Sequence, residues 1–121
     1  MIYQPPPSPT NQMPNNSHSI IYTITMIDTR DTDNILGFQK TPAIFTDLNR
    51  AIYAVINNEN DLADDSTYQY AVIEQTTLNE IRPLLECASI KYWYQYNSVI
   101  DEFQPCNEPK QFARVNGFGI G

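Results

Sequence analysis

The sequence predicts an α+β fold, in which one main helix packs on one face of a small antiparallel sheet. Residues 20–27 are a run rich in β-branched side chains, which is typical of a strand. Residues 90–97 alternate tyrosine with other side chains at a period of two, which also predicts a strand. Residues 48–56 repeat apolar side chains at helical spacing. We therefore expect about four strands, in the order β-hairpin, helix and two further strands.

Length and local composition predict one domain with a tail at each end. A chain of 121 residues has room for a single core. Residues 1–19 are rich in proline and asparagine and carry few apolar side chains, so we expect a disordered tail. The domain is expected over residues 20–115, and the glycine-rich residues 116–121 should form a flexible end.

The first two predicted strands form a hairpin. Residues 20–27 are almost continuously hydrophobic, as in a central strand that is covered on both faces. The polar residues 28–34 predict a turn, and residues 35–40 predict the returning strand. Gly37 within that strand indicates a bulge or a close backbone approach.

The helix follows the hairpin, and its start has two interpretations. Thr41 followed by Pro42 has the form of an N-cap and a first helical residue, whereas Thr46 followed by Asp47 is an alternative start. The helix should end at Asn57. The stripe expected to face the sheet has the spacing i, i+3, i+4, i+7 and i+8, and consists of Leu48, Ala51, Ile52, Val55 and Ile56.

The last part of the domain contains two further strands and an ambiguous segment. Residues 68–75 and 90–97 predict the third and fourth strands, and residues 99–103 are a candidate continuation after a turn. Residues 76–89 fit a short helix, a bulged extension or a loop, because Pro83 limits any helix there. The face away from the main helix is expected to be solvated, covered by a neighbouring segment, or buried against a partner.

The aromatic ladder of the fourth strand is the strongest candidate for a contact surface. Its period places alternate tyrosines on one face, and this face is either packed against the core or exposed. Tyrosine is enriched at protein interfaces, where it contributes a large area and a polar group. Tyrosines of the third strand would extend the patch if the two strands are neighbours. The predicted protein-contact residues are Tyr92, Tyr94, Tyr96, Tyr68 and Tyr70.

The charge of the chain excludes some partners and suggests another. Fourteen acidic and seven basic residues give a net charge of −7, which opposes binding to nucleic acid and to anionic membranes. An acidic surface is expected on the loop after the helix, at Glu59, Asp61, Asp64 and Asp65. A second acidic turn contains Asp28, Asp31 and Asp33. Neither matches a calcium loop, so we predict polar turns and no metal site.

Catalytic and redox chemistry find little support in the sequence. The single histidine, His18, lies in the predicted tail, so a nucleophile assisted by histidine is not expected. We therefore predict that the protein is not an enzyme and has no cofactor. Cys87 and Cys106 are predicted to be reduced thiols. Residues 1–19 lack the pattern of a secretory signal, so we expect a cytoplasmic protein.

The leading functional hypothesis is a small acidic, non-enzymatic protein-interaction module. It would bind through an aromatic sheet face or an edge strand, and the simplest partner is a second copy, because homodimers are the commonest oligomers. The alternative is an acidic inhibitor that imitates nucleic acid toward a basic protein, with Asp101 and Glu102 adding to the acidic surface. An enzyme without a recognisable motif is the third hypothesis.

Overall fold

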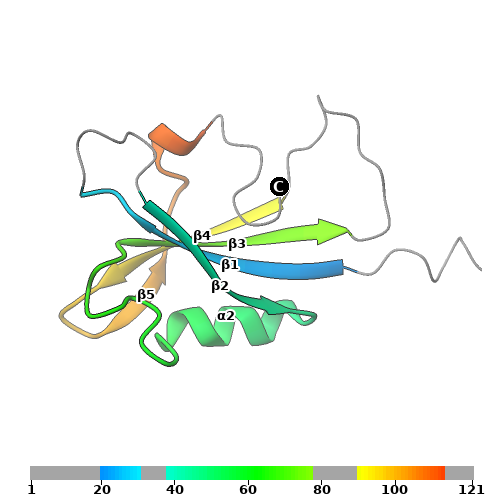
Figure 1. The fold of residues 1–121 in the computed structure, drawn as a ribbon, viewed down its shortest axis with the longest axis horizontal. Coiled ribbons are helices and arrows are strands. Elements are labelled where there is room, and N and C mark those ends of the chain that lie inside the picture. The colour runs from blue at the N-terminus through cyan, green and yellow to red at the C-terminus, as the bar shows by residue number, and fades with distance from the viewer. Residues whose placement is uncertain (1–19, 31–37, 78–89, 114–121) are drawn as a thin grey trace, which may run out of the picture.

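The computed structural model describes residues 20–30, 38–77 and 90–113. They form a five-stranded antiparallel sheet with the strand order β2-β1-β3-β4-β5 and an α-helix on one side of it (Figure 1). The elements are β1 (Ile20–Asp28), β2 (Phe38–Phe45), α2 (Leu48–Ile56), β3 (Tyr70–Thr77), β4 (Ile90–Asn97), β5 (Glu102–Pro105) and the 3-10 helix η2 (Lys110–Phe112). The α+β class is confirmed, and the sheet has one strand more than the sequence indicated.

The central position of β1 is confirmed. It pairs with β2 on one side and with β3 on the other, so Ile24 lies opposite both Ala43 and Ile73. Burial on both faces explains the continuous hydrophobicity of this strand. Ile24 belongs to the core on the helix side, whereas Ile27 belongs to a second core on the opposite side.

The position of β2 corrects the sequence prediction. Thr41 and Pro42, which were interpreted as a helix start, lie inside this strand. The register with β1 shifts between Ile24 and Met26, so two residues of β2 bulge opposite one residue of β1. Proline is tolerated there because β2 is an edge strand of the described sheet and a bulge needs no regular ladder hydrogen bond. The strand predicted at residues 35–40 therefore continues to Phe45, and its first three predicted residues lie outside the described part of the chain.

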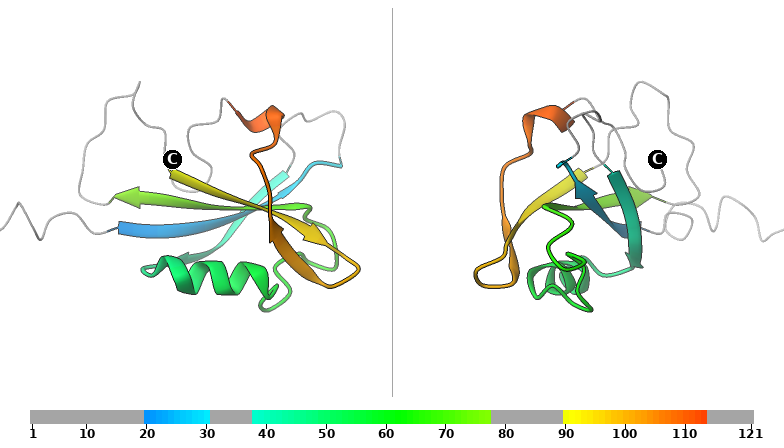
Figure 2. Two further views of the ribbon diagram at one scale, coloured as in Figure 1. Left: turned by 180° about the vertical axis from the view of Figure 1, so that it is seen from behind. Right: turned by 60° about the vertical axis from the view of Figure 1, so that its left-hand side comes forward.

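The start of helix α2 follows the alternative interpretation. Asp47 is the N-cap, and its Oδ1 accepts a hydrogen bond of 2.9 Å from the backbone N–H of Asn49. The predicted stripe is confirmed as the face on the sheet, with Val55 fully buried. Ala54 is also buried, which the predicted stripe did not include. Figure 2 shows the helix on one side of the sheet and η2 on the other.

The C-terminal segment covers the second face of the sheet. Phe112 of η2 is fully buried and stacks on Trp93, with ring centroids 5.3 Å apart and an interplanar angle of 12°. Tyr70 meets both rings edge-on, at 6.5 and 6.4 Å. Ile27 and Val72 complete this cluster. Of the alternatives for this face, cover by a neighbouring segment is the one observed here.

Several sequence predictions fall outside the described residues. These are the tail at 1–19, the turn residues 31–37 with Gly37, most of the ambiguous segment at 78–89 with Cys87, and the chain end at 114–121. The boundaries of the tail and of the flexible end therefore stay predictions. Within the part of the chain that the structure describes, no helix is both long and apolar enough to span a bilayer.

Candidate functional site

The tyrosines of β4 lie on the face of the sheet that carries α2. Tyr94 is only 6% exposed and belongs to the core that also contains Phe103. Burial, with a smaller contribution from Tyr92, raises the pKa of the Tyr94 hydroxyl. Tyr92 and Tyr96 are partly buried and pack against the same core. This arrangement corresponds to the packed-face interpretation of the ladder.

The two remaining candidate tyrosines do not extend that face as one surface. β3 and β4 are neighbours, as the patch required, but Tyr70 lies on the opposite face with Trp93. Tyr68 precedes β3 and packs against the helix-side core. The five predicted contact tyrosines are therefore divided between two faces of the sheet.

The acidic loop between α2 and β3 has an unusual backbone. Its residues with left-handed φ angles between 47° and 69° are Asn58, Asn60, Asp61, Asp64, Asp65 and Ser66. Short polar side chains tolerate this region because they can hydrogen-bond to the nearby backbone. Asp61 does so, since its Oδ2 accepts a bond of 3.0 Å from the N–H of Asp65. The loop conformation therefore explains part of its asparagine and aspartate content.

Asn58 joins this loop to the turn between β4 and β5. Its side chain is buried, its Oδ1 accepts a hydrogen bond of 2.8 Å from the N–H of Ala63, and its Nδ2 donates one of 2.9 Å to Asp101. The Tyr96 hydroxyl donates to the same carboxylate, and this bond raises the pKa of Tyr96. Sequence reasoning missed this role of Asn58, because asparagine is common at the C-terminal end of a helix and its position there needs no further explanation.

The acidic side chains of the loop are not equivalent. Glu59 forms a bidentate ion pair with Arg50 at 2.9 and 2.6 Å, and this bond lowers the pKa of Glu59. The arginine also lies 5.0 Å above the Phe45 ring, so the pair links the helix, the loop and β2. Asp61, Asp64 and Asp65 have no such ion pair within the described residues.

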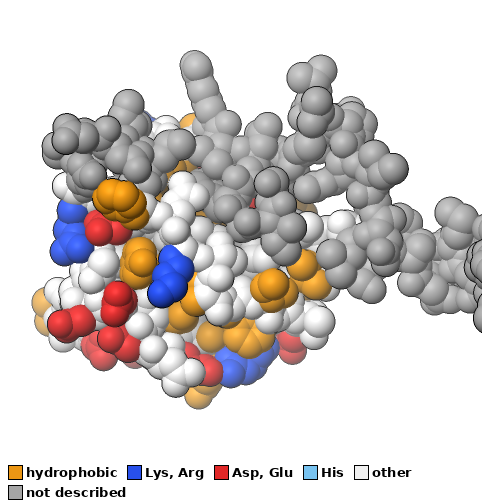
Figure 3. All heavy atoms as spheres, viewed as in Figure 1, with side chains coloured by type: hydrophobic (Ala, Val, Ile, Leu, Met, Phe, Trp, Pro, Cys, Tyr) orange, Lys and Arg blue, Asp and Glu red, His pale blue; other side chains and the backbone are white. Residues whose placement is uncertain are grey.

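Acidic groups gather at one end of the molecule. The 58–66 loop and the β4–β5 turn lie at the same end, since Asn58 bonds to Asp101. Figure 3 shows several acidic side chains grouped at this end of the visible face. Within the described residues, no group of three or more His, Cys, Asp or Glu side chains is arranged to hold a metal ion.

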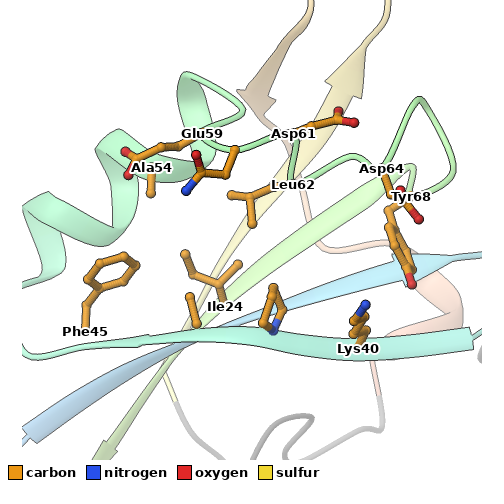
Figure 4. Close-up of a pocket in the computed structure, with 12 residues that line it drawn as sticks. Ile24, Lys40, Phe45, Ala54, Glu59, Asp61, Leu62, Asp64 and Tyr68 are labelled. Carbon is orange, nitrogen blue, oxygen red and sulfur yellow. The ribbon is translucent and has the colours of Figure 1, made fainter.

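A cavity of about 320 Å³ lies between β2 and the acidic loop, and we name it the β2 groove (Figure 4). Its apolar lining residues are Ile24, Pro42, Ala43, Phe45, Ala54 and Leu62. Its polar and aromatic lining residues are Lys40, Glu59, Asn60, Asp61, Asp64 and Tyr68. The groove therefore brings together three of the four predicted acidic residues and one of the predicted tyrosines.

The β2 groove has an apolar floor between two polar edges, which we call its lips: one is the acidic loop after α2, and the other is formed by Lys40 of β2. Ile24 of β1 and Leu62 of the loop lie in its middle, and Phe45 lies at one end (Figure 4). Lys40 and Tyr68 lie at the other end, with Asp64 on the loop side. An apolar floor with a few polar groups is the usual composition of a binding site. Sequence reasoning missed the groove because its walls come from four different elements, whose arrangement in space the sequence pattern does not give.

The exposed side of β2 adds further apolar surface beside the groove. Phe38 and Ile44 are each 56% exposed. Phe38 and Lys40 lie two residues apart on the same face of the strand, so Phe38 continues the line of the groove. Ile44 lies opposite Thr23, on the other face.

Comparisons with known proteins identify no relative: no protein-family model, no curated protein and no solved structure matches this chain.

Proposed function

We propose that this chain is a small, non-enzymatic module that binds another protein on the side of the molecule formed by β2. The observation that carries the proposal is that Phe38, which is 56% exposed, continues the line of a groove with an apolar floor. Ile44, also 56% exposed, adds apolar surface on the opposite face of the same edge strand. Exposed apolar patches bordered by polar residues are typical of interaction sites. The tyrosine face of β4 is a weaker candidate because Tyr94 is already buried within the molecule.

Contact through side chains fits β2 better than the addition of a strand. Pro42 has no backbone N–H, the register shift interrupts the ladder, and Lys40 is exposed on the strand. Prolines, bulges and lysines are devices by which natural sheets prevent pairing at their edges. The proposed partner therefore contacts the side chains of β2, and a second copy of the chain is one such partner.

The experiment compares wild type with a Phe38→Ser, Ile44→Ser double variant. Both side chains are exposed, so each change should alter the free energy of unfolding by no more than about 0.5 kcal/mol. Sedimentation measures self-association, and chemical cross-linking in a cell extract measures binding to other proteins. The proposal predicts that the double variant stays folded and loses the association seen with wild type. Unchanged association of the folded double variant would contradict it.

A second candidate function is that of an acidic inhibitor that imitates nucleic acid toward a basic protein. Its support is that Asp61, Asp64 and Asp65 lack ion pairs within the described residues and share one end of the molecule with Asp101. Such binding would weaken steeply as salt is raised, because exposed charges are screened over about 8 Å at physiological ionic strength. Apolar contact through Phe38 would persist at high salt. A salt series on the captured complex separates the two functions.

A further inference from the structure

The size and lining of the β2 groove limit what it can bind. A volume of about 320 Å³ is at the lower end of the range for small-molecule sites, which runs from roughly 300 to 1,000 Å³. It would hold on the order of ten water molecules at about 30 Å³ each. The accessible residue at its centre is the half-buried Leu62, since the neighbouring Ile24 is fully buried, so an apolar side chain gains by displacing water from Leu62. The groove therefore suits one or two apolar side chains.

The charges around the groove select a cationic partner. On the loop side, the carboxylates of Asp61 and Asp64 are exposed and have no ion pair within the described residues. Glu59, by contrast, is already paired with Arg50. Lys40 on the β2 side supplies one positive charge. Since the whole chain carries a net charge of −7, the surrounding field also attracts a basic molecule.

The shape of the surface favours an extended chain over a compact ligand. The groove follows β2, with Phe45 toward one end and Lys40 at the other (Figure 4). Beyond Lys40 the same face of the strand continues to the exposed Phe38. Alternate side chains of an extended peptide repeat at about 7 Å, which matches the spacing of Phe38 and Lys40 on β2. Such a peptide could occupy the groove and contact Phe38 together.

We propose that the β2 groove binds an extended, positively charged segment of a partner protein. One apolar side chain of the segment sits over the half-buried Leu62 and Ala43, and a neighbouring lysine or arginine lies beside Asp64. The segment is held by side-chain contacts, since Pro42 and the bulge prevent it from pairing regularly with β2. This inference rests on the proposed function, because it assigns the partner chemistry of the same side of the molecule.

The test measures binding of a fluorescently labelled probe peptide, in which one leucine is flanked by lysines, to the full-length chain by anisotropy. Replacing the leucine with serine should weaken binding at least about tenfold, because the apolar floor of the groove is left without a partner. Replacing the lysines with glutamates should abolish binding at concentrations of about 1 mM. Failure of the original probe to bind at that concentration would overturn the inference. Equal affinity for the leucine and serine peptides would overturn it as well.

Variants of the protein locate the site, with matched controls. Ala43→Leu fills the groove from β2, and Asp64→Asn removes one lip charge while keeping a side chain that tolerates a positive φ. Each should weaken probe binding several-fold. Asp65→Asn changes an exposed neighbour that does not line the groove and has a similar φ, and Ile44→Ala changes the opposite face of β2. Both controls should bind the probe like wild type.

The outcomes separate this inference from the proposed function. If Asp64→Asn and Asp65→Asn weaken the probe equally, or if folded Ala43→Leu keeps full affinity, the probe is not in the groove and the inference fails. The proposed function survives that result if the Phe38→Ser, Ile44→Ser double variant still loses its protein partner. Thermal melting of Ala43→Leu verifies its fold, and Asp64→Asn keeps the test valid if the larger side chain unfolds the domain.

Discussion

Replacing Asn58 with alanine is expected to destabilise the fold by about 3 kcal/mol. The change removes the acceptor of the Ala63 N–H and the donor to Asp101. A buried donor without a partner costs about 1–3 kcal/mol, and the lost bond to an exposed carboxylate adds about 0.5–1 kcal/mol. The backbone of residue 58 has a φ of 47°, where alanine adds about 1 kcal/mol relative to asparagine.

Two further variants divide this loss into its parts. Asn58→Gly removes the same hydrogen bonds but tolerates the positive φ, so it should be less destabilising than Asn58→Ala by about 1 kcal/mol. Asn58→Asp keeps an acceptor for Ala63 and replaces the donor with a carboxylate facing Asp101. That variant should be destabilised by repulsion between like charges, more strongly at low salt than at high salt.

The assay is urea unfolding followed by circular dichroism, which gives the free energy of unfolding for each variant. A loss of about 3 kcal/mol would lower the melting temperature of a domain of this size by roughly 15 °C. If Asn58→Ala remains within about 0.5 kcal/mol of wild type, then Asn58 does not fix the loop. The position of the acidic lip of the β2 groove would then lack its main support.

The remaining predictions concern the core and two titrating groups. Val55→Ala should lower the free energy of unfolding in urea by about 2 kcal/mol, because this side chain is fully buried. Asn49→Ala should leave the free energy of unfolding almost unchanged, because Asn49 is exposed. Equal effects of the two changes would contradict the orientation of the helix. Tyr94→Ala should cost about 3–5 kcal/mol, and a stable variant that only lost association would contradict its place in the core. Glu59→Gln should lower the melting temperature at pH 7, because the arginine partner lowers the pKa of Glu59. The difference from wild type should shrink as the pH falls through this lowered pKa, and a difference that stays constant as the pH is lowered would refute the ion pair. In a Cys87→Ser variant, Cys106 should react more slowly with a thiol reagent at pH 8 when the protein is folded than when it is unfolded in urea, because burial raises the pKa of the Cys106 thiol. Equal rates would show that the thiol is exposed in the folded protein.

Regular hydrophobic patterns made much of the fold predictable. The helix stripe and the central strand were identified because each has a period or a continuity that burial imposes on the sequence. The fourth strand, β4 (Ile90–Asn97), was predicted with its observed bounds. By contrast, the end of β2 was misplaced because Pro42 is compatible with a helix start as well as with a bulged edge strand. Only the tertiary pairing with β1 distinguishes these two.

The candidate site was less predictable than the fold. The acidic residues were identified individually, but sequence alone does not indicate that Glu59 is paired with Arg50 while Asp64 lies exposed on a groove. Phe112 is a single aromatic residue in a polar segment, so no periodicity marks its burial on Trp93. The groove leaves little local signal in the sequence, because its lining residues meet only when β1, β2, α2 and the following loop have folded together.

The tyrosine ladder illustrates why alternation alone is ambiguous. A period of two places Tyr92, Tyr94 and Tyr96 on one face but does not indicate what covers that face. In the structure, Tyr94 packs in the core beneath α2, and Tyr96 contacts the Phe103 ring at a centroid distance of 5.1 Å. The area that made these residues candidates for a contact surface therefore contributes to the stability of the domain.

A nuclear magnetic resonance titration of the isotope-labelled chain with the leucine–lysine probe peptide locates the binding site residue by residue. If the peptide binds in the β2 groove, the largest backbone shift changes will lie in β2 from Lys40 to Phe45 and in the loop from Glu59 to Asp64, while Trp93 and the rest of the opposite face stay unchanged. Shift changes centred on the β4–β5 turn, or spread evenly over all acidic residues, would contradict the claim that the β2 groove is the binding site.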